Sequence, residues 1–167
     1  GWMNDTLKYY GRDPIYRKYH HNELTFSMAY FYSERFILPL SHDEVVHGKH
    51  TIVDKMWGSY DQKFAQAKNL YLYQFTHPGK KLNFMGNELG HFREWDEARE
   101  LDWDLLKYPA HQEFFDYFSA LNQFYKRCPA LYENDYHSGC FSFVPVKTKG
   151  TAVLSYRRAA GGQELLT

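Results

Sequence analysis

The chain has 167 residues, and its twenty basic and twenty acidic side chains cancel to a formal net charge of zero. This balance removes the electrostatic attraction expected of a nucleic-acid binder or a polybasic membrane-surface protein, and no apolar run approaches the length of a membrane span. Hydrophobic residues make up 44% of the chain, enough for the core of one domain and the start of a second. We therefore expect a soluble globular protein that binds neither nucleic acid nor membrane.

Aromatic residues make up 19% of the chain, with 15 Tyr, 13 Phe and 4 Trp. Flat rings fill cores, and they also stack on the apolar faces of sugars or bases. The neutral charge favours a sugar over a base, although composition alone favours a core role. The two cysteines, Cys128 and Cys140, lack CxxC spacing, so we expect neither a disulfide framework nor a thiolate zinc site. A reducing compartment, and hence a cytoplasmic location, fits best.

The first part of the chain is loop-like, with one short helix expected near residues 4–10. The spacing of apolar residues predicts a helix over 23–33, with Asn22 as its N-cap. Residues 36–40 form a short, continuously apolar run. Such a run is typical of a strand buried on both faces, and Pro39 should lie near the end of that strand.

A capping-box pattern at residues 59–62 predicts a helix that ends at the His-Pro-Gly sequence of residues 77–79. Residues 81–85 predict a second buried strand. A further helix should begin near Pro109 and end before Pro129. This order of helix, strand, helix, strand, helix predicts a parallel sheet covered by helices.

After the last predicted helix the pattern becomes that of a β-hairpin. Alternating or β-branched residues at 140–146 and 151–156 predict two strands joined by a turn at 147–150. We therefore expect a domain boundary within 129–136 and the start of an all-β module after it. The chain opens without a signal-peptide pattern and stops shortly after a new apolar stretch begins, which favours a fragment of a longer protein.

Polar side chains follow both predicted strands of the parallel sheet. The first strand leads into S-H-D-E-V-V-H-G-K-H at residues 41–50, the densest titratable cluster in the chain. The second leads into G-N-E-L-G-H at 86–91, with R-E-W-D at 93–96. Because parallel α/β sheets bind ligands at the carboxyl ends of their strands, we expect the two clusters to share one rim.

Three interpretations of the first cluster are open. In one, His42 and Asp43 cap the following segment and pair with each other. In another, a metal is bound by His42, Glu44, His47 and His50; the helical two-histidine motif, however, needs a spacing of four, and His42 and His47 are five residues apart. In the third, Asp43 stabilises positive charge on a sugar ring carbon while His42 donates to a sugar hydroxyl. The neutral charge, the aromatic residues and the strand-end position favour the third.

The run L-P-L-S-H-D-E-V-V-H-G-K at residues 38–49 resembles the fourth sequence region of the α-amylase superfamily, specifically of its glycogen (1,4-α-glucan) branching enzymes. Further motifs of that family occur in the same order: G-W-M-N-D-T-L at 1–7, H-P-G-K-K-L at 77–82, F-M-G-N-E at 84–88, and R-E-W through L-D-W at 93–103. The resemblance covers nearly the whole chain. It departs mildly at Leu89 and Trp57, where an aromatic residue and a proline are expected.

The resemblance implies an α/β fold that is the C-terminal part of a (β/α)8 TIM barrel. Residues 1–130 would supply the segment after strand six and then strands seven and eight with their helices. Residues 131–167 would begin the family's C-terminal all-β sandwich domain. Because part of a barrel leaves strand edges unpaired, we expect the isolated chain to self-associate.

For the site, the resemblance implies that Asp43 is the third catalytic carboxylate, the transition-state stabiliser, and that His42 binds a hydroxyl of the reacting glucose. The family's nucleophile and acid/base lie on earlier strands, upstream of Gly1, so the isolated chain should be inactive. Further residues that could line the glucan groove are Trp2, Asp5, Glu44, His47, Glu88 and Trp95.

The enzyme that this chain resembles is a glycosyltransferase of glycogen biosynthesis, and its partner is an α-glucan such as glycogen or an amylose-like chain. It cleaves an α-1,4-glucan, holds the chain as a covalent glycosyl-enzyme and passes it to a 6-hydroxyl to make an α-1,6 branch. We expect no metal and no cofactor. Two other functions stay open: a non-catalytic sugar-binding or scaffold domain, and another glycoside hydrolase of the superfamily.

Overall fold

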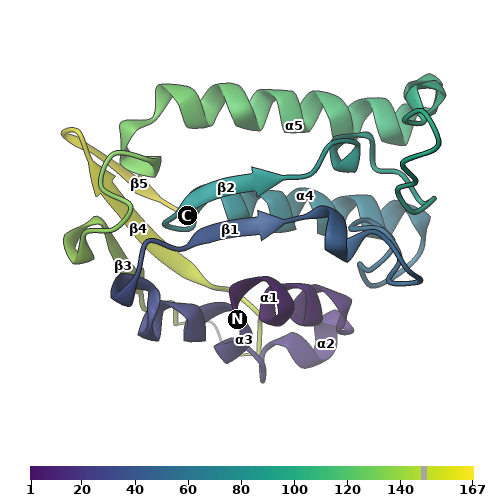
Figure 1. Ribbon diagram of the computed structural model, residues 1–167. Helices are drawn as coiled ribbons and strands as arrows, with labels where there is room; N and C mark the ends of the chain where they lie inside the picture. Colours follow the sequence, from purple (N-terminus) through teal and green to yellow (C-terminus); the bar gives the residue numbers. More distant parts are fainter. Residues whose placement is uncertain (148–149) are drawn as a thin grey trace.

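The computed structural model describes residues 1–147 and 150–167, in which helices surround two small sheets (Figure 1). The α-helices are α1 (Trp2–Gly11), α2 (Pro14–Arg17), α3 (Asn22–Thr25), α4 (Tyr60–Thr76) and α5 (Pro109–Arg127). The strands are β1 (Ile37–Leu40), β2 (Lys80–Asn83), β3 (Phe141–Val144), β4 (Ser155–Ala160) and β5 (Gln163–Leu166). Short 3-10 helices are η1 (Phe26–Ala29), η2 (Phe31–Ser33), η3 (His42–Glu44), η4 (Asn87–Leu89), η5 (Trp103–Lys107), η6 (Pro129–Leu131) and η7 (Ser138–Cys140).

Strands β1 and β2 pair in parallel, with Leu38 opposite Lys81, and β3, β4 and β5 form a separate antiparallel sheet. Figure 1 shows α5 along one side of the parallel pair and α1 to α3 along the other, with α4 behind the strands. The helix α4 contacts both α5 and α1. The predicted parallel pairing is confirmed, with helices packed over one face of the pair, and the fold is a mixture of helix and sheet.

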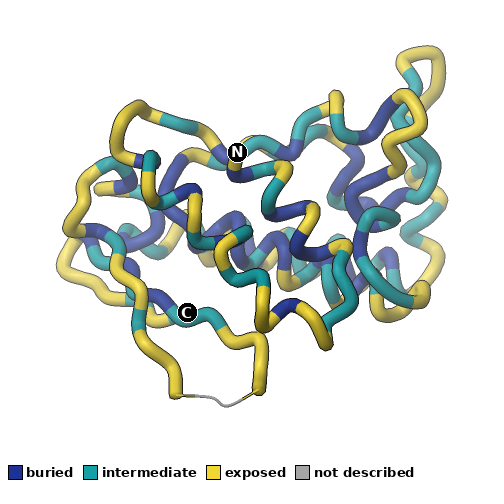
Figure 2. Tube along the Cα trace, turned by 90° about the horizontal axis from the view of Figure 1, so that it is seen from below, coloured by how far each residue is buried: buried dark blue, intermediate teal, exposed yellow. Residues whose placement is uncertain are grey.

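The predicted helices 59–77 and 109–129 are confirmed as α4 and α5. In both, the residues at the start and the spacing of the apolar residues favour the same helix. Ser59 and Gln62 form the expected capping box at the start of α4. The buried face of α4 then packs against α5 through aromatic edges: the Phe64 and Phe114 ring centroids lie 5.7 Å apart. Figure 2 shows that the buried residues run through the middle of the molecule, whereas the exposed ones lie on its outer turns.

The predicted helix over residues 23–33 is wrong in its length. Only Asn22–Thr25 is α-helical, and the chain then tightens into the 3-10 helices η1 and η2. Asn22 lies inside the short helix, and His21 is its N-cap. Phe31 is buried, stacked on Tyr136 with ring centroids 5.7 Å apart. Such tertiary packing of aromatic rings outweighs helical periodicity here.

The predicted burial of both strands on both faces is also wrong. In β1, Leu38 and Leu40 are buried, but Ile37 is 49% exposed. In β2, Leu82 is 39% exposed. Because Pro39 pairs with Leu82 and side chains alternate along a strand, Ile37 and Leu82 lie on one face of the pair. Within the described residues, that face has no covering layer.

In the C-terminal sheet the first predicted strand is confirmed as β3, whereas the second begins later than the sequence predicts. The second strand of the predicted hairpin was expected at 151–156, whereas β4 spans Ser155–Ala160. The expected turn at 147–150 includes residues 148 and 149, which lie outside the described residues. Gly161 and Gly162, both with positive φ, form the turn that joins β4 to β5. Tyr156 of β4 belongs to the same buried cluster as α1 and α4 residues, so this sheet packs directly on the helical part.

A buried ion pair connects β4 to the rest of the chain. The Arg158 guanidinium donates to an Asp135 carboxylate oxygen at 2.7 Å and to the Thr76 carbonyl at 2.7 Å. The other Asp135 oxygen accepts from Lys80 at 2.8 Å. Burial alone would raise the pKa of Asp135, but the Lys80 hydrogen bond and the neighbouring positive charges of Lys81 and Arg158 lower it overall.

No helix of the described ranges, 1–147 and 150–167, has both the length and the apolar character needed to cross a membrane.

The substitution Asp135→Ala should destabilise the chain by about 3–5 kcal/mol, because it leaves the guanidinium of Arg158 buried without its carboxylate. Urea unfolding followed by circular dichroism at one fixed protein concentration measures this loss. The matched control is Asp104→Ala, whose carboxylate is 87% exposed in an ion pair with Lys107 and should matter by less than about 0.5 kcal/mol. Equal losses in the two variants would contradict the role given to the buried pair.

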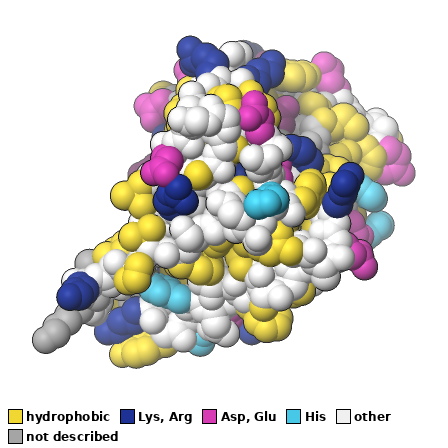
Figure 3. Space-filling model, turned by 90° about the vertical axis from the view of Figure 1, so that its left-hand side faces the viewer, with side chains coloured by type: hydrophobic (Ala, Val, Ile, Leu, Met, Phe, Trp, Pro, Cys, Tyr) yellow, Lys and Arg dark blue, Asp and Glu magenta, His cyan; other side chains and the backbone are white. Residues whose placement is uncertain are grey.

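The isolated chain should self-associate or be only marginally stable. In the described residues β1 pairs only with β2, so each strand has a free edge, and the face with Ile37 and Leu82 is open. Figure 3 shows hydrophobic side chains also on the end of the molecule opposite the strand carboxyl ends. Gel filtration with light scattering at several concentrations tests this expectation. A compact monomer of 20.0 kDa with a sharp cooperative melt would contradict it.

Candidate functional site

The loops that follow β1 and β2 lie side by side at the carboxyl end of the parallel pair. Figure 1 shows both strands pointing to the same end of the molecule, where both loops lie. The amide of Phe84 donates to the Leu40 carbonyl at 2.9 Å, and the amide of Trp95 donates to the Val45 carbonyl at 3.0 Å. The predicted shared rim is therefore confirmed.

Aromatic contacts across this rim position His42. The His42 and Phe84 ring centroids are 5.7 Å apart, and the Phe84 and Trp95 centroids are 5.2 Å apart in an edge-to-face arrangement. A surface hollow of about 430 Å³, the rim groove, lies beside these rings. It is lined by His42, Val46, His47, Arg93, Glu94, Trp95, Asp96, Glu97 and Arg99. The rim groove thus combines aromatic rings with charged side chains from both loops.

Asp43 is exposed and directly follows His42, but it is not among the residues that line the rim groove. Its side chain is 65% exposed, and its charged partner is the Lys49 ammonium, 3.2 Å from a carboxylate oxygen. Lys49 also donates to the Asp43 carbonyl at 2.9 Å. Among the described contacts Asp43 makes no hydrogen bond to His42, so the first interpretation of the cluster, in which these two residues pair, is wrong.

The other polar residues of this loop have separate partners. The Glu44 side chain is 13% exposed and lies 3.9 Å from the Lys49 ammonium. His47 is exposed and lines the rim groove, whereas the His50 ring bonds to Asp54 at 2.8 Å. Within residues 1–147 and 150–167, no group of three or more His, Cys, Asp or Glu side chains could hold a metal ion. The metal interpretation has no support in this arrangement.

Similarity searches give many related proteins with one name. The chain is 51% identical to the 1,4-alpha-glucan branching enzyme GlgB of Aquifex aeolicus, 49% to that of Oceanobacillus iheyensis and 48% to that of Pseudomonas aeruginosa, each over 99% of the chain. The predicted resemblance is confirmed. The chain covers 26%, 26% and 23% of these branching enzymes, and thus about a quarter of their length. No protein-family model matches the chain.

Two residues expected to line the groove, Trp2 and Asp5, lie elsewhere. Trp2 and Asp5 both belong to α1, which runs beside β1 (Figure 1). Trp2 is 7% exposed and stacks on Tyr73, with ring centroids 6.1 Å apart. Asp5 lies in the first turn of that helix, and its side chain is 35% exposed. Neither residue lines the rim groove, because helix formation begins at Trp2 rather than after a loop.

Glu88 and Trp95 follow β2, as expected, but only Trp95 lines the rim groove. The Glu88 carboxylate accepts from the amide of Gly86 at 3.1 Å and from the Asn83 side chain at 3.4 Å. Glu88 therefore stabilises the turn after β2. Its binding role stays a prediction.

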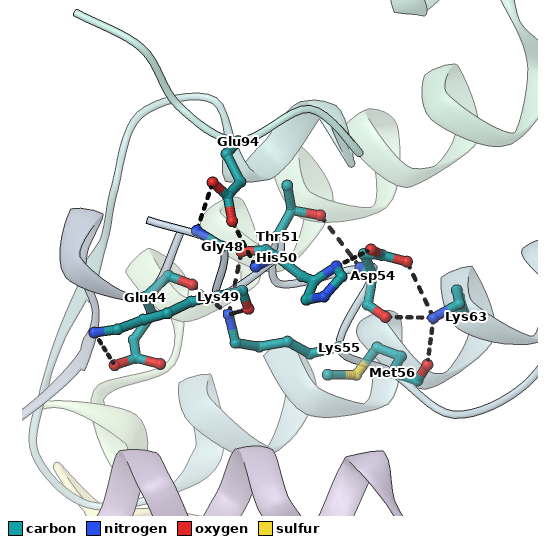
Figure 4. Close-up of polar contacts among 10 residues, drawn as sticks. All are labelled: Glu44, Gly48, Lys49, His50, Thr51, Asp54, Lys55, Met56, Lys63 and Glu94. Atoms are coloured by element: carbon teal, nitrogen blue, oxygen red, sulfur yellow. Dashed lines mark hydrogen bonds and ion pairs between the residues drawn. The ribbon is translucent and has the colours of Figure 1, made fainter. Parts of the chain in front are cut away.

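Two further residues, Lys55 and Glu94, were not expected from the sequence. Both bind the backbone of the loop at residues 41–59, here called the Asp43 loop (Figure 4). Glu94 accepts from the backbone amides of Gly48 and His50, and these hydrogen bonds lower the pKa of its carboxyl group. Lys55 donates to three backbone carbonyls of the Asp43 loop. Burial lowers the pKa of Lys55, against the opposing attraction of Glu44. No sequence motif marks Lys55, and although Glu94 lies in the R-E-W motif, that motif does not show that its carboxylate binds backbone amides.

Proposed function

We propose that this chain is part of a glycogen branching enzyme. The whole enzyme would cleave an α-1,4-glucan and transfer the released chain to a 6-hydroxyl, which forms an α-1,6 branch. One observation carries the proposal: an exposed carboxylate, Asp43, lies next to an aromatic-lined groove where two parallel strands end. The similarity to branching enzymes over 99% of the chain supports it.

The proposed place of the chain is the end of a (β/α)8 barrel. Residues 1–130 would carry strands seven and eight of the barrel, which correspond to β1 and β2, and residues 131–167 would begin a C-terminal all-β domain. Two features support this assignment. The unpaired edges of β1 and β2 are available to neighbouring barrel strands, and the open face with Ile37 and Leu82 has the apolar character of a barrel interior.

Asp43 and His42 would act at the glucose whose bond is cleaved. Glycoside cleavage passes through a transition state with positive charge on the ring carbon, and a fixed carboxylate nearby lowers its energy. The Asp43 carboxylate is open enough to reach a sugar ring. His42, with its ring held against Phe84, would donate a hydrogen bond to a sugar hydroxyl. Trp95 and His47 would contact neighbouring glucose units along the rim groove.

The remaining catalytic groups would come from the rest of the enzyme. A nucleophilic carboxylate would attack the anomeric carbon, and an acid would protonate the departing 4-oxygen, which leaves a covalent glycosyl-enzyme. The same acid, now a base, would take the proton of an attacking 6-hydroxyl. Two successive inversions retain the α configuration. No carboxylate of this chain is assigned either of these two roles.

The isolated chain should neither branch nor hydrolyse amylose, because one stabilising carboxylate cannot replace a nucleophile and a proton donor. Incubation with amylose followed by the iodine absorption spectrum measures this directly. A reproducible spectral change that Asp43→Asn abolishes would contradict the proposal. It would favour a self-contained hydrolase instead.

In the full-length enzyme, Asp43→Asn should keep the fold and lower kcat/KM about 10²–10³-fold, or about 2.7–4 kcal/mol, because a preorganised charge at the transition state is lost. The melting temperature should shift little, since the two side chains have nearly the same shape and this one is exposed. Branching rates and thermal melts of the two proteins give both numbers. Asp104→Asn, at an exposed carboxylate outside the rim groove, is the matched control and should leave kcat/KM unchanged. Near-normal activity of Asp43→Asn would mean that Asp43 has no catalytic role.

A further inference from the structure

The loop between β1 and α4, which carries Asp43, is long and contains several residues with positive φ angles. It runs from residue 41 to 59, longer than most connections in compact domains, and its only regular element is the short helix η3. Three of four successive residues in it have positive φ angles: 59° at His47, 77° at Gly48 and 67° at His50. Non-glycine residues seldom adopt this conformation, so other contacts must stabilise it.

The ammonium of Lys55 provides one set of these contacts (Figure 4). It donates to the backbone carbonyls of Glu44, Lys49 at 2.6 Å and His50 at 3.2 Å. A lysine ammonium has three donors, and here all three are directed at one stretch of backbone. Lys55 therefore ties the beginning of the loop to its tip.

The carboxylate of Glu94 provides the second set from the other loop. One oxygen accepts from the Gly48 amide at 3.0 Å, and the other accepts from the His50 amide at 2.7 Å. Both amides belong to the residues with positive φ. The 44–50 backbone is thus held by its carbonyls from one side and by its amides from the other, as Figure 4 shows.

Lys49 connects this held backbone to Asp43. Its carbonyl is bound by Lys55, while its own ammonium contacts both the carbonyl and the carboxylate of Asp43. We infer that Lys55 and Glu94 are positioning residues for the reaction, which fix the 44–50 backbone and thereby the direction of the Asp43 carboxylate. This inference rests on the proposed function. Both oxygens of Glu94 and the ammonium of Lys55 are used on backbone atoms, so neither residue is assigned a contact with glucan.

The test uses Lys55→Met and Glu94→Gln in the full-length enzyme. Lys55→Met keeps the alkyl stem without the ammonium, and Glu94→Gln can accept from only one of the two amides through its single carbonyl oxygen. Misplacement of a catalytic group by about 1 Å costs up to about 100-fold in rate. We expect kcat for branching of amylose to fall about 10- to 100-fold in each variant, with KM changed less than about twofold. Lys55→Arg, which keeps the charge and several donors, should restore most of the lost kcat.

Lys63→Met is the matched control, because Lys63 also holds backbone of this loop but at its other end. Lys63, on α4, donates to the carbonyls of Asp54 and of Met56, the latter at 2.8 Å. This variant should lower the melting temperature as Lys55→Met does while kcat is unchanged. Hydrogen exchange gives a readout independent of activity. Amides of residues 44–50 should exchange faster in Lys55→Met and Glu94→Gln but not in Lys63→Met.

The results separate the inference from the proposed function when Asp43→Asn is measured alongside. If Asp43→Asn is inactive while Lys55→Met and Glu94→Gln keep normal kcat and normal exchange, the positioning role is overturned and the proposed function stands. If Asp43→Asn keeps its activity, the catalytic role proposed for Asp43 fails and the inference fails with it. Should Lys55→Met not fold, Glu94→Gln decides, because its side chain lies at the surface of the rim groove.

Discussion

Parallel pairing of β1 with β2 is the constraint on which the rest of this structure depends. In a parallel pair the carboxyl ends of both strands lie at the same end of the sheet, so the segments after Leu40 and Asn83 must start side by side. The backbone bonds from Phe84 to Leu40 and from Trp95 to Val45 continue that alignment beyond the strands. A groove between the loops is then a consequence of topology, and its chemistry is set by the side chains that each loop carries.

The same pairing leaves the chain incomplete as a structural unit. Two parallel strands in an α/β fold are normally covered on both faces and flanked by further strands, whereas here one face of the pair is open within the described residues. The chain offsets part of this exposure with a buried ion pair between Arg158 and Asp135 and with packing of Tyr156 in the main core. The matched branching enzymes are about four times longer than this chain, and in the barrel proposed above their additional residues would supply the neighbouring strands.

Local signals that agreed with tertiary packing could be read from the sequence. The capping box at Ser59, the proline at the start of α5 and the apolar run of β1 all specified their elements, because nothing in the packing opposed them. The break of the expected helix at 23–33 into 3-10 helices could not be predicted, since burial of Phe31 against Tyr136 depends on residues far away in the chain. The burial of Trp2 depends in the same way on Tyr73. In the candidate site His42, Asp43 and Glu94 lie in sequence motifs, whereas Lys55 does not, and the backbone contacts of Lys55 and Glu94 leave no pattern in the sequence.

A crystal structure of the full-length enzyme with a bound malto-oligosaccharide tests the central claim most directly. The account predicts a sugar ring in contact with His42, stacking of a glucose unit near Trp95, and the Asp43 carboxylate within hydrogen-bond distance, about 2.5–3.2 Å, of hydroxyls on the ring at the cleavage point. It also predicts that β1 and β2 pair with neighbouring strands on their free edges. An oligosaccharide bound in the active site of that enzyme with Asp43 and His42 directed away from every sugar ring would contradict the account.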